Sequence, residues 1–341
     1  MILDDNSKDM GSELEFNFDE SYIVEGIPGS GKATIAVTLL RKIREEQKGT
    51  FKLIVPTNIC KQYFLTGLSY LGMSLDTVTT WKAWNIRKEN FDFIIVYGAH
   101  KFSIENIFLL KEKVSKAIII FGETKQFIPN SQQFPYNTRM DMLSELTGLK
   151  LKKRIKSYTI TRKNALLAES IIRDNPLVNC FFLNRFQSEP RIHRFDSSRE
   201  EIKYISKLIE NKPNVVVLFR TFEELENVYH QLKTLRIDIE IQKNKYSTGK
   251  LEFNEIDFTS DKPKMMTYFG ISGIKFQNVI LPQCSLSFTE ISSLYDAITH
   301  CSENIFITYT KHLSSLFDHV SPELFTEYYV PEDDNNHDFL F

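Results

Sequence analysis

The sequence predicts two α/β domains, each with a mostly parallel β-sheet flanked by helices. The 341 residues suit two compact domains better than one. In the first half, short runs of β-branched and aromatic residues alternate with longer amphipathic stretches, and the same pattern returns in the second half. Short apolar runs of this kind are typical of strands buried on both faces of a parallel sheet. Their alternation with helical stretches indicates doubly wound domains.

The apolar runs give the expected positions of the strands. They are residues 22–24, 52–55, 93–96 and 117–121 in the first half, and 215–219, 264–268, 278–282 and 304–309 in the second. Helices are expected over 33–46 and 222–235, where apolar side chains recur at helical spacing. The predicted organisation is, in order, a flexible leader, two domains and an acidic tail: 1–20, 21–150, 151–325 and 326–341.

The composition excludes several classes of protein. The formal charge of −2 gives no global basic field of the kind that marks dedicated nucleic-acid binders. One basic run, Lys152-Lys153-Arg154 followed by Lys156, fits either a solvated connector or a local basic groove. The four cysteines lie too far apart for a zinc site or a disulfide framework. No apolar stretch reaches the roughly 18 residues of a membrane span, so we expect a cytoplasmic protein without a membrane partner.

A glycine-rich segment follows the first predicted strand and precedes the first predicted helix. Its residues are Gly26, Ile27, Pro28, Gly29, Ser30, Gly31 and Lys32. Glycines in this setting let backbone N–H groups surround a phosphate at a helix N-terminus, and the lysine reaches the β- and γ-phosphates. The segment therefore predicts a phosphate loop for ATP or another NTP, with contacts from Gly26, Gly29, Ser30, Gly31 and Lys32. The hydroxyl that would hold Mg²⁺ directly after the lysine is missing, because that residue is Ala33.

Further segments follow the loop at intervals along the chain. They are Pro56-Thr57-Asn58, Thr80-Trp81, 91–102, 122–126, 155–159, 215–232, 267–282 and 294–309. In order and context they resemble motifs Ia to VI of the superfamily 1 helicases, both the UvrD/Rep type and the related helicases of RNA viruses. The resemblance covers residues 20–310 and implies two RecA-like P-loop domains. The short interval between the motif Ia and motif II segments leaves no room for a large inserted subdomain.

The positions that carry hydrolysis in this family differ in the present chain. The motif II aspartate and glutamate fall on Tyr97 and Gly98, and the arginines of motifs IV and VI fall on Thr159 and His300. Hydrolysis requires Mg²⁺, a positioned water and cations that stabilise the transferring phosphoryl group. Together with Ala33, these degenerate positions predict that Mg²⁺ binds poorly, if at all, and that no residue can be assigned a catalytic role.

Motif III departs less from the family. Glu123 keeps a carboxylate in this motif, and Gln126 keeps the glutamine expected to contact the nucleotide. His100, in the motif II segment, is interpreted as a structural or coupling residue rather than a catalytic base. The resemblance therefore implies a nucleotide site that has kept its loop and lost most of its chemistry.

Four functions remain open from the sequence, and one of them is a nucleotide-sensing switch that binds without turnover and needs only Gly29, Gly31 and Lys32. The first is an accessory or scaffold subunit that docks on a protein partner or a nucleoprotein complex and still binds nucleotide or nucleic acid. The second is a non-hydrolysing binder of single-stranded DNA or RNA, with contacts implied by the family at Thr57, Asn58, Thr80, Trp81 and Tyr268. The third is a weakly active ATP-dependent helicase. Fold analogy alone does not decide between them.

Overall fold

The computed structural model of the chain describes most of the sequence. The described residues are 18–123, 138–173, 180–242, 256–268, 271, 273–285 and 291–331. They fall into two compact units, Met1–Tyr158 and Thr159–Phe341. Each unit is an α/β fold with a mostly parallel sheet, which confirms the fold class predicted from the sequence.

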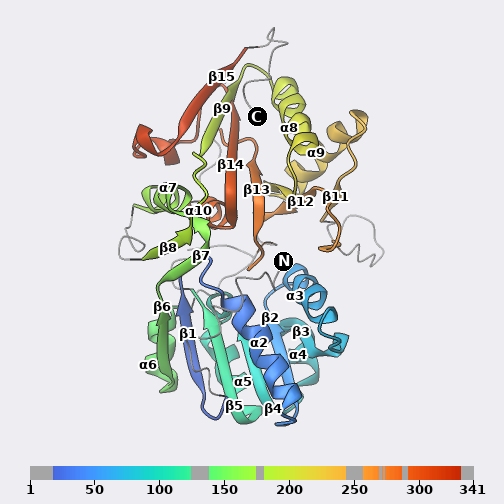
Figure 1. Ribbon diagram of the computed structural model, residues 1–341, viewed down its shortest axis with the longest axis vertical. Helices are drawn as coiled ribbons and strands as arrows, with labels where there is room; N and C mark the ends of the chain where they lie inside the picture. The colour runs from blue at the N-terminus through green and yellow to red at the C-terminus, as the bar shows by residue number, and fades with distance from the viewer. Residues whose placement is uncertain are drawn as a thin grey trace. The chain divides into compact units, whose positions relative to one another are not determined.

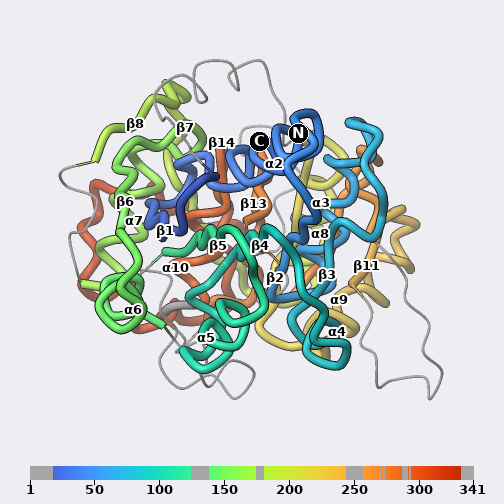
Figure 2. Tube along the Cα trace, turned by 90° about the horizontal axis from the view of Figure 1, so that it is seen from below, coloured from blue at the N-terminus to red at the C-terminus, as the bar shows by residue number. Residues whose placement is uncertain are grey.

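The first unit is built on a six-stranded sheet whose described pairings are all parallel. Its strands are β1 (Tyr22–Gly26), β2 (Phe51–Val55), β3 (Val78–Thr80), β4 (Phe91–Tyr97), β5 (Val114–Gly122) and β6 (Lys150–Arg154). Their order across the sheet is β3-β2-β4-β5-β1-β6, which can be followed in Figure 2. Because β1 lies between β5 and β6, the segments that follow these three strands meet at the same edge of the sheet.

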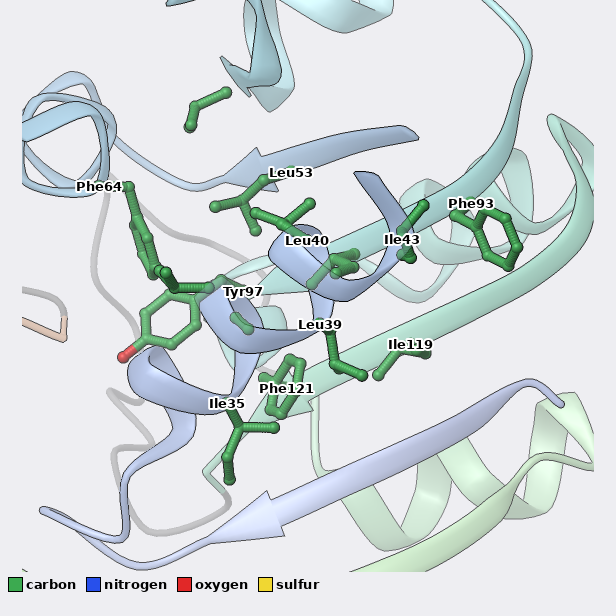
Figure 3. Close-up of a cluster of buried hydrophobic side chains, with 14 of the residues drawn as sticks. Ile35, Leu39, Leu40, Ile43, Leu53, Phe64, Phe93, Tyr97, Ile119 and Phe121 are labelled. Carbon is green, nitrogen blue, oxygen red and sulfur yellow. The ribbon is translucent and has the colours of Figure 1, made fainter. Parts of the chain in front are cut away.

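Helices cover both faces of this sheet. They are α2 (Lys32–Glu45), α3 (Asn58–Ser69), α4 (Trp81–Arg87), α5 (Ile104–Glu112) and α6 (Met140–Thr147). Side chains alternate along the strands, so that α2 and α3 share one apolar cluster with Leu53, Phe93 and Phe121, as Figure 3 shows. The intervening strand residues, such as Ile94 and Ile120, pack against α4, α5 and α6 on the opposite face.

The second unit contains a seven-stranded sheet in the order β11-β12-β10-β13-β14-β9-β15, again with parallel pairings (Figure 1). Its strands are β9 (Arg191–Phe195), β10 (Val215–Phe219), β11 (Glu240–Ile241), β12 (Lys264–Thr267), β13 (Phe276–Leu281), β14 (Cys301–Thr310) and β15 (Thr326–Val330). Its helices are α7 (Arg162–Ile172), α8 (Ser198–Asn211), α9 (Phe222–Thr234) and α10 (Ile291–Thr299). Apolar residues of α8 and α9 form one cluster with β10, while α7 packs against α10.

A separate two-stranded sheet joins β7 (Lys156–Thr161) and β8 (Phe181–Asn184). β7 begins in the first unit and ends in the second. The structure therefore moves the boundary between the units from the expected residue 150 to Tyr158. The reason is β6, which adds to the edge of the first sheet beside β1 and keeps residues 150–154 in the first unit.

Both ends of the chain also differ from the expected boundaries. Phe18, expected in the leader, is buried and meets the ring of Phe93 edge-on at a centroid distance of 6.0 Å. Thr326–Val330, expected at the start of the acidic tail, forms β15 and pairs with β9. The rest of the predicted leader (1–17) and tail (332–341) lies outside the described residues. None of the described helices is long and apolar enough to cross a membrane.

Candidate functional site

The loop between β1 and α2 has the backbone of a phosphate-binding loop. Gly29 and Gly31 have φ angles of 73° and 80°, in the left-handed region that glycine adopts without strain. Gly26 is required for a different reason, since a Cβ atom there would lie 2.3 Å from Ser30 Oγ. The three glycines thus permit a tight turn at the N-terminus of α2, which favours negative charge. The predicted residues Gly26, Gly29, Ser30, Gly31 and Lys32 are brought together here.

Lys32 is folded back onto this loop. Its ammonium donates to the carbonyl oxygens of Gly26 at 2.6 Å and Ile27 at 2.9 Å. It also forms an ion pair with Glu123 at 3.1 Å between Nζ and Oε2, and the two side chains are only 10% and 4% exposed. Glu123 directly follows β5, the neighbour of β1 in the sheet. The cation that would meet a phosphate is therefore held by its own loop and by a buried carboxylate.

The segment after β6 fastens the loop from the other side. Arg154 is buried, and its Nε donates to the carbonyl oxygen of Ser30 at 2.8 Å, while Ile27 N–H donates to the Arg154 carbonyl at 3.2 Å. Tyr158 N–H donates to the Gly29 carbonyl at 2.9 Å. The sequence placed Arg154 in a basic run without indicating this contact. Since β6 is a strand, its side chains alternate, and only every second one can turn toward the loop.

Lys152 and Lys153 of the basic run face carboxylates. Lys152 Nζ lies 3.4 Å from Glu20, and Lys153 Nζ lies 3.8 Å from Glu25. Lys152 also lies over the ring of Tyr22. Lys152 and Lys153 therefore sit on an edge strand with their charge partly neutralised, and a role for the run as a basic groove stays a prediction.

The two positions matched to the motif II carboxylates lie at the end of β4. Tyr97 is 6% exposed, and its ring packs edge-on against Phe64 at 4.8 Å in the cluster under α2 and α3 (Figure 3). Burial raises the pKa of Tyr97 well above its ordinary value, so the phenol is neutral. Gly98 has a φ of 71°, and a Cβ atom there would lie 3.2 Å from Pro56 Cγ. One position is therefore a core residue, and the other has a backbone that disfavours any side chain.

The residues around the loop do not fit Mg²⁺. Ala33 offers no oxygen and packs against the apolar cluster of the first unit. Glu123 is engaged by Lys32, and Tyr97 is neutral. Across the described part of the chain, no group of three or more His, Cys, Asp or Glu side chains could hold a metal ion.

His100 lies in the short 3₁₀ turn Ala99–Lys101 that follows β4. The side chain is buried, and neither ring nitrogen has a hydrogen-bond partner among the described residues. Burial, with smaller effects from Lys101 and Lys32, lowers the pKa of His100 well below its usual range. The ring is therefore neutral near pH 7, and its interpretation as a structural or coupling residue stays a prediction.

The two positions matched to the family's arginines lie in β7 and at the end of α10. The Thr159 carbonyl accepts a hydrogen bond from Asn184 of β8. His300 is 1% exposed, and Gly273 N–H donates to its Nε2 at 3.2 Å. Because a backbone N–H can only donate, Nε2 must be unprotonated, and Nδ1 then donates to the Asp296 carbonyl. His300 thus fastens the turn at Gly273 to α10 within the second unit.

The predicted nucleic-acid contacts occupy varied positions. Thr57 and Thr80 cap α3 and α4, accepting from Cys60 N–H at 3.1 Å and Ala83 N–H at 3.4 Å. Asn58 is exposed, whereas Trp81 is partly buried against Trp84 at 5.4 Å. Tyr268 is 3% exposed, so a stacking role requires its ring to leave the interior of the second unit and stays a prediction.

Gln126, the last predicted nucleotide contact, lies outside the described residues. The two interactions that the sequence did not indicate, Lys32 with Glu123 and Arg154 with Ser30, join residues 91 and 124 positions apart. The order of β5, β1 and β6 in the sheet creates both. The only sequence signals for them were the carboxylate of Glu123, shortly after the predicted strand 117–121, and the guanidinium of Arg154 in the basic run.

Comparisons with known proteins identify a family for the chain. The sequence model of the viral superfamily 1 RNA helicase core domain matches residues 22–299. Among solved structures, the chain is similar to an arterivirus helicase, nonstructural protein 10, with 14% identity, a TM-score of 0.46, and coverage of 90% of this chain and 62% of that one. The helicase of PRRSV gives 12% identity, a TM-score of 0.47, and coverage of 89% and 54%.

A bacterial domain is also similar. The C-terminal domain of a possible DNA helicase from Lactobacillus plantarum gives 14% identity and a TM-score of 0.40, with coverage of 50% of this chain and 98% of that domain. The sequence comparison with curated proteins gave no match. The chain thus spans 62% and 54% of the lengths of the two viral helicases.

Proposed function

Because the chain belongs to the viral superfamily 1 RNA helicase family, we propose that it is a helicase-like protein that binds without hydrolysing nucleotide. In this proposal it acts as an accessory or scaffold subunit of a protein or nucleoprotein complex. The observation that carries the proposal is the end of β4, where a core tyrosine and a left-handed glycine stand at the positions matched to the motif II carboxylates.

The physical argument concerns charge at the transferring phosphate. Hydrolysis of a nucleoside triphosphate depends on a bound divalent ion and on cations placed around the γ-phosphate. Tyr97 and Gly98 supply neither a metal ligand nor a base that could orient water, and Ala33 has no hydroxyl. A family fold that keeps its phosphate loop but lacks these groups supports binding, and it does not support turnover.

The loop itself fits a nucleotide. Gly26 and the two left-handed glycines leave the space and the N–H groups that a phosphate chain needs, and Lys32 is available at the start of α2 once Glu123 is displaced. We propose ATP or another NTP as the ligand, bound without a metal ion held by the protein.

A phosphate-release assay with ATP and Mg²⁺ tests the absence of hydrolysis. Wild-type protein and Lys32→Ala are expected to release phosphate at the same background rate, because the wild type lacks the groups that accelerate the reaction. Magnesium-dependent release by the wild type that disappears in Lys32→Ala would refute the proposal. In the native host, the accessory role predicts that Lys32→Ala still supports assembly of the complex, whereas a motor would lose its function.

A second candidate function is binding of single-stranded RNA or DNA. It is favoured by Asn58, exposed at the N-terminus of α3, and by Trp81, partly exposed at the start of α4. These helices follow the adjacent strands β2 and β3, so both starts lie at one edge of the sheet. Backbone contacts and stacking on an aromatic ring are the usual means of holding a single strand.

Fluorescence anisotropy with labelled single strands tests this second function. Binding should weaken steeply between about 50 and about 200 mM salt, and Trp81→Ala should weaken it by about tenfold. Ile86→Ala, at the exposed end of the same helix, is the matched control and should leave the affinity unchanged. Equal affinities for wild type and Trp81→Ala would exclude stacking on this residue.

A further inference from the structure

We propose that Glu123 is a built-in competitor that closes the phosphate loop, and that a triphosphate enters only by displacing it as a metal-free polyanion. This inference rests on the proposed function of the loop as a nucleotide site without turnover. It adds the ligand form that the site takes and the contact that regulates its access.

The hydrogen bonds of Lys32 carry the first step. An ammonium group has three N–H donors. Lys32 Nζ lies 2.6, 2.9 and 3.1 Å from the acceptor oxygens of Gly26, Ile27 and Glu123. A further contact, Ser30 Oγ, lies at 3.5 Å. All three donors are therefore matched inside the protein, and a phosphate oxygen can gain one only if an existing acceptor gives it up.

The second step identifies which acceptor can leave. The Gly26 and Ile27 carbonyls belong to the backbone of the loop. Two hydrogen bonds hold this backbone, one from Ile27 N–H to the Arg154 carbonyl and one from Tyr158 N–H to the Gly29 carbonyl. Arg154 Nε adds a bond to the Ser30 carbonyl. Glu123, in contrast, reaches Lys32 with a side chain that can change rotamer without moving the loop. Its carboxylate is an anionic hydrogen-bond acceptor, as a phosphate oxygen is, so the two compete for the Lys32 ammonium.

The third step concerns the charge that the ligand brings. Of the charged groups that contact the loop, Lys32 and Arg154 are cations and Glu123 is an anion. Displacing Glu123 exposes more positive charge to the ligand. Mg²⁺ would neutralise the triphosphate in advance, and the loop offers no oxygen to hold the ion, since Ala33 stands where a hydroxyl would be needed. The free polyanion is therefore the better ligand.

The test compares Glu123→Gln with wild type by isothermal titration, using ATP and inorganic tripolyphosphate as probes, each with EDTA and with Mg²⁺. The glutamine keeps the size of the side chain and removes its charge. We expect both probes to bind Glu123→Gln about tenfold more tightly than wild type in EDTA, the change that about 1.4 kcal/mol produces. We also expect Mg²⁺ to weaken binding of both proteins.

Two further variants keep the result interpretable. Glu25→Gln removes a carboxylate from the end of β1 that pairs with Lys153, and it should leave the affinity of the loop unchanged. Glu123→Asp keeps the charge on a shorter side chain, so its affinity should fall between wild type and Glu123→Gln. Thermal unfolding of each variant shows whether the fold is intact.

Each outcome has a distinct meaning. Equal or weaker binding by folded Glu123→Gln overturns the inference and leaves the proposed nucleotide binding intact. An absence of binding by both proteins overturns the inference together with the nucleotide binding of the proposed function. Phosphate release by wild type that is lost in Glu123→Gln would instead assign Glu123 a catalytic role and overturn the proposed function as well. Tighter binding by Glu123→Gln without phosphate release supports both.

Discussion

Tyr97→Asp is expected to destabilise the first unit by about 4 kcal/mol, even though it would return a carboxylate to the position matched to motif II. Tyr97 lies in the cluster under α2 and α3, where its ring packs edge-on against Phe64 (Figure 3). The substitution removes a large buried ring and places a charged group among apolar side chains. The nearby residue Glu123 would repel that charge further.

The first unit can be followed selectively in the full chain. Both tryptophans of the sequence, Trp81 and Trp84, belong to this unit, so their fluorescence during urea unfolding reports its stability. Tyr97→Phe should change the midpoint little, because the ring and its packing remain. Tyr70→Asp is the matched surface control, since Tyr70 is 58% exposed in the same unit, and it should be close to neutral.

A different result would change the interpretation of the nucleotide site. If Tyr97→Asp folds with wild-type stability and gains magnesium-dependent phosphate release, the site is a motor that a single substitution interrupts. If it is destabilised as expected, core packing determines which residue this position accepts. A carboxylate there would then require redesign of the core around it. Gly98 leads to the same conclusion, because its left-handed backbone and the nearby Pro56 ring both disfavour a glutamate.

The central strands could be predicted from the sequence because they are buried on both faces. Runs such as 93–96 and 215–219 are continuous and apolar, and they became β4 and β10. The edge strands could not be found in this way. β6 reads Lys-Leu-Lys-Lys-Arg and β15 reads Thr-Glu-Tyr-Tyr-Val, since an edge strand contacts solvent and carries polar residues. β6 and β15 lie where the end of the first unit and the start of the tail differ from the expected residues.

In the candidate site, too, the sequence could predict only some of the features. The glycines and Lys32 form one continuous segment, so local spacing was enough to predict the tight loop between β1 and α2, and its binding of phosphate stays a prediction. The ion pair with Glu123 depends on β1 and β5 lying side by side, and that adjacency is a property of the sheet order. The burial of Tyr97 follows from strand alternation, since residues 93, 95 and 97 share a face, but the sequence did not indicate which face α2 and α3 cover.

His300→Arg is expected to destabilise the second unit by about 4 kcal/mol, although it would return an arginine to the position matched to motif VI. His300 accepts from Gly273 N–H and donates to the Asp296 carbonyl in a site that is almost completely buried. A guanidinium has no acceptor, so the Gly273 N–H would lose its partner, and a larger charged group would have to fit into the buried site beside Asp296.

Two unfolding signals in the same experiment test this expectation. Because tryptophan fluorescence follows the first unit alone, His300→Arg should leave that transition unchanged and move the circular-dichroism transition of the second unit to lower urea. His300→Gln can still accept and donate, so its loss should be smaller, and His230→Arg makes the same exchange at an exposed position of α9 and should be neutral. A stable His300→Arg variant would mean that the arginine reaches the surface and that the second unit remains able to present a cation. A destabilised one would mean that an internal contact occupies this position in the second unit, as Tyr97→Asp tests in the first, and it would support the proposal of a helicase-like protein without hydrolysis.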